Sequence, residues 1–201
     1  MNKIRAIIFD FDGVIVNNYE QHYNLSEKKI INITREEHRK LFEGNIHVER
    51  EKLKHRDTGF DLMKVFSDSK KTDVIDNKIK EILESLSNNY LLGVITSGYE
   101  YGINNFLKNN DLSKTFSFVY GYETDKIKIH KFEKALKEFN LTKDECIFVT
   151  DTLGDILEAN EVGIRTIAVD FGFHERERLQ KGNPTWIVSS FRELYNIILN
   201  I

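Results

Sequence analysis

The sequence predicts an α/β protein: a doubly wound, Rossmann-like parallel sheet core with a small all-helical cap inserted after strand 1. Short β-branched or aromatic runs alternate with segments of helical period, which favours parallel strands joined by right-handed helical crossovers. The strand-like runs are apolar on both faces, as a sheet covered by helices on both sides requires. One interval, 17–72, contains no convincing strand and is far longer than a crossover needs.

The expected strands are runs such as "IRAIIF" and "CIFVT". In chain order they cover 4–9, 90–96, 116–121, 146–150, 164–170 and 185–188. Apolar residues at helical spacing separate most of these runs and predict the core helices. They are Ile75, Ile79, Ile82, Leu83 and Leu86; Ile103, Phe106 and Leu107; Phe132, Ala135, Leu136 and Phe139; Ile156, Leu157 and Ala159; and Phe191, Leu194, Ile197 and Ile198.

The interval 17–72 is expected to form the helical cap, which leaves 1–16 and 73–201 for the core domain. Two stretches, 26–44 and 45–68, are rich in both charge signs and predict helices. Thr34 with Glu37 three residues later predicts a capping box at a helix start.

The composition argues against several classes of function. The 201 residues carry a net charge of −3, and no basic tract is long enough to indicate nucleic-acid binding. The apolar runs are too short to span a bilayer, and the N-terminal stretch does not predict a signal peptide. Cys146, the single cysteine, is expected to be an inert core thiol. A cytoplasmic protein without a nucleic-acid or membrane partner is therefore expected, and its oligomeric state stays open.

Asp10 and Asp12 in "DFDG" come directly after the first expected strand. Ligands of doubly wound sheets bind beyond the carboxyl ends of the strands, and Gly13 allows the chain to turn there. Two carboxylates this close repel each other unless a cation or a shared proton lies between them, and oxygen-rich clusters of this kind suit Mg²⁺. A helix cap or turn is the alternative for this pair on its own.

Polar groups follow two further strands and one loop. Thr96 and Ser97 end the second strand, where they predict either a phosphate site or a helix N-cap. Asp151 ends the fourth strand, and Asp155 follows as either a site residue or an acid that complements a helix dipole. Lysines precede a helix in "TDKIKIHKF" and predict either a solvated surface or a counter-charge to the acids.

In this order the pieces resemble the four motifs of the haloacid dehalogenase superfamily of phosphohydrolases. "IIFDFDGV", "GVITSG" and "VTDTLGD" match the first, second and fourth motifs. The third motif is looser, because this chain lacks the prolines that many capped relatives carry beside their lysine. The spacing between Lys126 and Asp151 is similar to that of relatives with these prolines. The spacing between Lys128 and Asp151 is closer to that of relatives without them. Both lysines therefore stay candidates for the third motif, and Lys128 is favoured.

The resemblance implies a role for each residue. Asp10 would be the nucleophile and Asp12 the general acid and base. Mg²⁺ would bind Asp10, the main chain of Asp12 and Asp151, with Asp155 in or next to that shell. Thr96, Ser97 and the lysine, Lys128 or Lys126, would bind the phosphoryl oxygens. A helical cap after the first strand is similar to phosphoglycolate phosphatase and phosphoglucomutase relatives and implies a small phosphorylated metabolite.

Other activities share parts of this pattern. A phosphomutase has the same four motifs, so it stays an alternative to a phosphatase. A dehalogenase is disfavoured, because its first motif lacks the aspartate present here as Asp12. A receiver-type phosphoacceptor ranks lower, because its acids come from different strands, whereas Asp10 and Asp12 share one loop. A non-catalytic binding relative also ranks lower, because every core motif position is chemically intact here.

Overall fold

Strand β1 (Ala6–Phe9) lies inside a six-stranded sheet in the computed structural model, which describes residues 3–201. Met1 and Asn2, which the predicted core domain includes, lie outside the described residues. The strand order is β3-β2-β1-β4-β5-β6, and every neighbouring pair is parallel. The other strands are β2 (Leu91–Ile95), β3 (Phe118–Tyr120), β4 (Cys146–Thr150), β5 (Arg165–Val169) and β6 (Trp186–Val188).

The sheet is doubly wound, as predicted. The chain runs outward from β1 through β2 and β3 on one side, and then through β4, β5 and β6 on the other. The winding therefore reverses between β1 and β4, which pair directly, with Phe9 opposite Val149. A reversal of this kind leaves a crevice beyond the carboxyl ends of the two strands.

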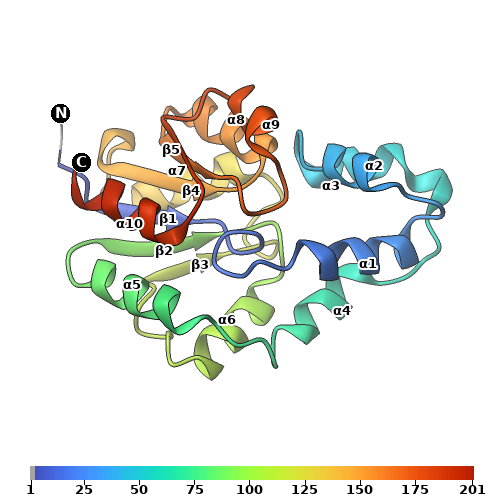
Figure 1. Cartoon of the computed structure of the whole chain (residues 1–201), viewed down its shortest axis with the longest axis horizontal. Helices are drawn as coiled ribbons and strands as arrows, with labels where there is room; N and C mark the ends of the chain where they lie inside the picture. The colour runs from blue at the N-terminus through green and yellow to red at the C-terminus, as the bar shows by residue number, and fades with distance from the viewer. Residues whose placement is uncertain (1–2) are drawn as a thin grey trace.

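Alternate residues of each strand bury opposite faces of the sheet. Along β1, Ile7 and Phe9 pack into one apolar cluster, whereas Ala6 and Ile8 pack into another. The first face is covered by α5 (Asn77–Ser87), α6 (Glu100–Asn109) and α10 (Phe191–Leu199). The second is covered by α7 (Lys128–Glu138) and α8 (Leu153–Val162), so helices lie on both sides of the sheet (Figure 1). Cys146 is buried on this second face as a free thiol.

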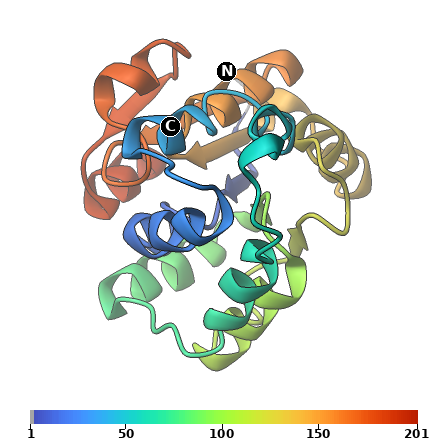
Figure 2. The same cartoon turned by 90° about the vertical axis from the view of Figure 1, so that its right-hand side faces the viewer.

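Residues 17–72, called the helical segment below, lie beyond one end of the sheet (Figure 1). They contain α1 (Tyr19–Lys29), α2 (Arg35–Lys40), α3 (Ile46–Lys52), a 3-10 turn η1 (Lys54–Arg56) and α4 (Leu62–Ser69). Tyr19, Tyr23 and Leu41 help to form a small apolar cluster there, which also includes Phe173 of the core. Seen from that end, the helices of the segment stand in front of the sheet (Figure 2). Its division into a separate cap domain stays a prediction.

The two stretches of this segment that predict helices do form helices, and each is interrupted. Asn32 has a left-handed backbone (φ 52°) between α1 and α2. The capping box of Thr34 and Glu37 is confirmed and begins a new helix. Gly59 (φ 83°) likewise separates η1 from α4. The short helix α9 (Arg176–Gln180) has no counterpart among the predicted elements.

Among the contacts between the helical segment and the sheet-bearing part, two are close approaches at small residues. Helix α4 packs against α6, where a Cβ on Gly102 would lie 2.9 Å from the Cβ of Ser67. The loop before α3 meets the first turn of α8, and the amide of Gly154 donates to the carbonyl of Phe42 at 2.8 Å. Within residues 3–201, no helix is long and apolar enough to cross a membrane.

Candidate active site

The carboxyl ends of three adjacent strands bring predicted site residues to one edge of the sheet. Asp10 follows β1, Thr96 follows β2 and Asp151 follows β4. Six of the eight predicted residues line this first cavity: Asp10, Asp12, Thr96, Ser97, Lys128 and Asp155. Asp151 is fully buried. Lys126 lines a second, neighbouring cavity instead.

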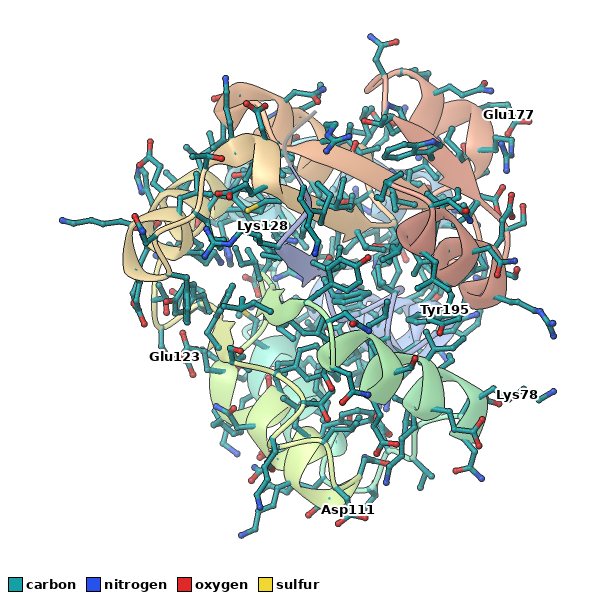
Figure 3. All side chains as sticks on the ribbon, turned by 90° about the vertical axis from the view of Figure 1, so that its left-hand side faces the viewer. Lys78, Asp111, Glu123, Lys128, Glu177 and Tyr195 are labelled. Atoms are coloured by element: carbon teal, nitrogen blue, oxygen red, sulfur yellow. The ribbon has the colours of Figure 1, made fainter. Side chains whose placement is uncertain are left out.

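Lys128 is the lysine that contacts the acids. Its Nζ lies 3.1 Å from Oδ2 of Asp10 and 2.7 Å from Oδ2 of Asp155, and its side chain is 1% exposed. Burial alone would lower the pKa of Lys128, but the two carboxylates raise it overall, so the ammonium stays charged. Figure 3 shows Lys128 among the side chains inside the molecule. The Nζ of Lys126 lies 5.3 Å from the ring centroid of Tyr122, away from these acids.

The three buried carboxylates differ in charge preference. Burial, together with Asp155 and Asp151, raises the pKa of Asp10 despite Lys128. Burial also raises the pKa of Asp151, to about 8. Burial would raise that of Asp155 as well, but Lys128 and the hydroxyl of Thr150, which donates at 2.7 Å, lower it overall. Asp155 is thus held as the anion paired with Lys128, while Asp10 and Asp151 lack sufficient positive charge nearby.

The missing positive charge is what a divalent cation would supply. The Oδ2 atom of Asp151 accepts from the amide of Phe173 at 2.7 Å, but its buried Oδ1 has no hydrogen-bond partner in the described chain. The backbone of Gly13 (φ 84°) approaches this carboxylate closely. Only glycine fits there, because a Cβ at this position would lie 1.9 Å from Oδ2 of Asp151. In residues 3–201, no three acidic, histidine or cysteine side chains form a metal cluster by themselves. A cation here would therefore need main-chain and water oxygens as well, which Mg²⁺ accepts readily.

The turn after β2 is not a helix cap. Helix α6 starts at Glu100 with Tyr99 as its N-cap, and neither Thr96 nor Ser97 caps it. Instead, Oγ1 of Thr96 accepts from the amide of Gly98 at 3.1 Å, and both residues line the cavity. Asp151 is not a cap either, because Thr152 caps α8.

Two buried lysines near the site, Lys131 and Lys70, were missed by the sequence analysis, and Arg50 was left out of the predicted site. Lys131, fully buried, donates to the carbonyl of Thr96 at 2.6 Å and supports the turn after β2. Lys70, also fully buried, donates to Asp12. Arg50 lines both cavities. In the sequence each stands among other charged residues, and only packing between distant elements distinguishes it from a surface residue.

The two cavities differ greatly in size. The first has a volume of about 60 Å³, enough for a phosphoryl group. The second has a volume of about 640 Å³, within the usual range for small-molecule sites. Arg50, Leu62 and Met63 line both, so the two spaces adjoin.

The order of the strand-end acids along the chain and the geometry of the site agree with a match between this chain and a known protein family. A family model described as haloacid dehalogenase-like hydrolase matches residues 7–169. The chain belongs to the haloacid dehalogenase-like hydrolases. The predicted family and the assignment as a hydrolase are thereby confirmed.

Known members of the haloacid dehalogenase-like hydrolases resemble this chain to different extents. Phosphoglycolate phosphatase from Photorhabdus laumondii is 30% identical over 122 residues, which cover 58% of this chain and 51% of that protein. The chain therefore spans about half the length of that relative. Pyrophosphatase PpaX from Bacillus mycoides is 21% identical over 217 residues, which cover 99% of each protein.

Solved structures of haloacid dehalogenase-like proteins share the fold. A variant of CbbY from Rhodobacter sphaeroides in complex with xylulose-(1,5)bisphosphate has a TM-score of 0.75, with 18% sequence identity. The match covers 95% of this chain and 96% of that chain. A likeness at this identity shows the fold alone.

Proposed function

We propose that the chain is a Mg²⁺-dependent phosphatase that hydrolyses a small phosphorylated metabolite through an aspartyl-phosphate on Asp10. The observation that carries this proposal is the convergence of Asp10, Thr96 and Lys128 on a cavity of phosphoryl size. Asp10 presents Oδ2 beside the Nζ of Lys128, at 3.1 Å. A carboxylate nucleophile beside a fixed ammonium group suits attack on an anionic phosphorus centre.

The chemistry has two steps. An oxygen of Asp10 bonds to phosphorus while the ester P–O bond breaks, and Asp12 gives its proton to the departing oxygen. Water then attacks the phosphorus, Asp12 takes a proton from it, and the bond between Asp10 and phosphorus breaks. Lys128 and the hydroxyls of Thr96 and Ser97 hold the phosphoryl oxygens throughout.

The residues present fit a magnesium ion. Asp10, Asp151 and the main-chain carbonyl of Asp12 would hold it, with Asp155 next to that shell. Bound there, Mg²⁺ neutralises charge on the transferring phosphoryl group. The unpartnered Oδ1 of Asp151 and the raised pKa values of Asp10 and Asp151 support this placement.

The organic part of the substrate would extend toward the second cavity and carry a second anionic group. Arg50 stands where the cavities adjoin, and its Nη2 lies 3.2 Å from Nε2 of His22. Burial lowers the pKa of Arg50 to about 10, and no carboxylate of the described chain counters that shift. A half-buried guanidinium without an anionic partner is poorly compensated, and a carboxylate or second phosphate of the substrate would supply that partner.

Hydrolysis of p-nitrophenyl phosphate with and without Mg²⁺ tests the proposal. We expect magnesium-dependent turnover in the wild-type protein and its loss in Asp10→Asn, which removes the nucleophilic anion at nearly constant shape. Circular dichroism of the variant serves as the folding control. Turnover that survives Asp10→Asn would refute the proposal, and transfer of phosphate to a sugar rather than to water would indicate a phosphomutase.

A further inference from the structure

We propose that Lys70 is a positioning residue that orients the carboxylate of Asp12 for proton transfer, an inference that rests on the proposed function. Lys70 directly follows α4, at the return of the chain from the helical segment to the core. It is distant from Asp12 in sequence, and none of the recognised motifs includes it. Its side chain is 0% exposed and donates a hydrogen bond to Oδ1 of Asp12.

The surroundings of Lys70 fix its ammonium group. The Nζ atom lies 3.7 Å from the ring centroid of Phe66 and 5.3 Å from that of Phe11. Aromatic faces attract a cation and restrict its movement, especially away from water. The only acceptor that the hydrogen bonds of residues 3–201 give this Nζ is Asp12. A lysine buried at this cost and directed at one carboxylate oxygen has a defined orientation.

A second donor holds the same oxygen of Asp12. The side-chain amide of Asn18 donates to Oδ1 at 2.7 Å. Asn18 directly precedes α1, where the chain enters the helical segment. The two donors therefore come from the two crossings between the core and the helical segment.

The other oxygen of Asp12 stays available. Across the described residues no hydrogen bond to Oδ2 is formed, and this atom lies 3.6 Å from the position that a Cβ of Gly98 would take. Oγ1 of Thr96 lies 3.5 Å from the same position. Oδ2 thus faces the turn that would hold the phosphoryl group, while Oδ1 is tied down on the other side.

This arrangement matters for the first step of the reaction. As the P–O bond to the leaving group breaks, the electron pair stays on the departing oxygen, and the proton of Asp12 must be delivered to that atom. General acid catalysis contributes about 10²–10⁴-fold, and it depends on the donor oxygen lying within hydrogen-bond reach. Without Lys70, the Asp12 side chain could rotate about its χ angles and present either oxygen in several directions.

The leaving group provides a selective test. Substituted phenyl phosphates are similar in size, but p-nitrophenolate leaves without help, whereas phenolate, whose conjugate acid has a pKa of about 10 like tyrosine, needs the proton. The value of kcat/KM reports the steps up to formation of the aspartyl-phosphate. We expect Lys70→Met to lower kcat/KM for phenyl phosphate at least tenfold more than for p-nitrophenyl phosphate. Asp12→Asn should show the same selectivity, more strongly.

Lys71→Met is the matched control. Its side chain is 53% exposed and pairs with Asp68 at 3.0 Å, so we expect wild-type values for both esters. For each variant, the ratio of the two kcat/KM values is measured on one protein sample, so a partly unfolded fraction lowers both values equally and cancels. Should Lys70→Met fail to fold, Asn18→Ala tests the same idea and should give a smaller selective loss.

Two outcomes would overturn the inference. Equal losses on both esters would mean that Lys70 only supports the fold or attracts the anionic substrate, and no loss on either would mean that Asp12 needs no positioning. The proposed function is judged separately, because it fails if the wild-type protein hydrolyses neither ester or if Asp10→Asn retains turnover.

Discussion

At the scale of single residues, the cations of the site come from separate elements: Lys128 begins α7, Lys70 follows α4 and Arg50 lies in α3. Asp10 and Asp151 could be placed together from sequence because the carboxyl ends of parallel strands share one edge of the sheet. The choice between Lys126 and Lys128 needed the structure. The two lysines are only two residues apart at the start of a helix, and the exact start of the helix decides which side chain points inward. Lys70 and Arg50 lie in charged stretches whose sequence is typical of solvated helices.

The isolation of Arg50 leads to a prediction about substrates. In Arg50→Gln we expect kcat/KM for phosphoglycolate, which carries a carboxylate, to fall about 10–100-fold, because a charge-assisted bond is worth about 1.5–3 kcal/mol. p-Nitrophenyl phosphate has no second anion and should be affected only a few-fold. Steady-state kinetics with both esters measure the difference.

Lys52→Gln on the same helix controls for the loss of a positive charge. Lys52 is 64% exposed and pairs with Glu49, and it lines neither cavity. A loss in Arg50→Gln that is equal for the two substrates would show that Arg50 does not recognise a second anion.

At the scale of elements, the strands were predicted closely and the helical segment only in outline. Each expected strand lies within a residue or two of the observed one, because an apolar run covered on both faces has clear ends. The charged stretches have no such ends. Asn32 lies in the break between α1 and α2 and Gly59 in the break between η1 and α4, and composition does not fix their left-handed conformations.

The contact between α8 and the loop before α3 is expected to be sensitive to one methyl group. A Cβ on Gly154 would lie 2.4 Å from the carbonyl oxygen of Gly44, so Gly154→Ala must push the loop and α8 apart. Overpacking of this kind costs about 1–3 kcal/mol. We expect a lower denaturation midpoint and about tenfold lower turnover, because the loop also lines the first cavity.

Urea denaturation and p-nitrophenyl phosphate turnover measure these two effects. Glu161→Ala, at an exposed position of the same helix, should change neither. If Gly154→Ala matched the wild-type protein in both, the close approach of the two backbones would have no energetic weight.

At the scale of the whole molecule, buried histidines link stability to pH. Burial lowers the pKa of His38 to about 3 and that of His174 to about 4. His38 Nε2 lies 2.8 Å from Nδ1 of His22, and His174 Nε2 lies 2.9 Å from the carbonyl of Arg39, so these rings connect elements of the helical segment to each other and to the core. All of them are held neutral.

Acidification should therefore unfold the protein earlier than its carboxylates alone would. Below the unfolded-state histidine pKa of about 6.5, the unfolded chain binds protons that the folded chain does not. The contribution of the buried histidines to stability is then complete above that pH and declines as pH falls toward 4, by up to about 1.4 kcal/mol per pH unit for each such histidine. Urea midpoints measured between pH 7.5 and 4.5 check this.

Exposed histidines should not contribute. Replacement of His55, which is exposed, by asparagine is expected to leave the slope unchanged. Because the raised pKa values of Asp10 and Asp151 oppose the histidine slope, the deciding comparison is a variant: a slope that stays unchanged in His38→Gln would contradict the prediction.

The small volume of the first cavity, about 60 Å³, sets a condition on every catalytic cycle. This space holds little more than the reactive end of a metabolite, so we expect residues 17–72 to move aside as substrate enters and product leaves. If that movement is slower than the bond rearrangements, it limits turnover. We then expect turnover to fall in a more viscous buffer, although the added viscogen alters none of the reacting groups.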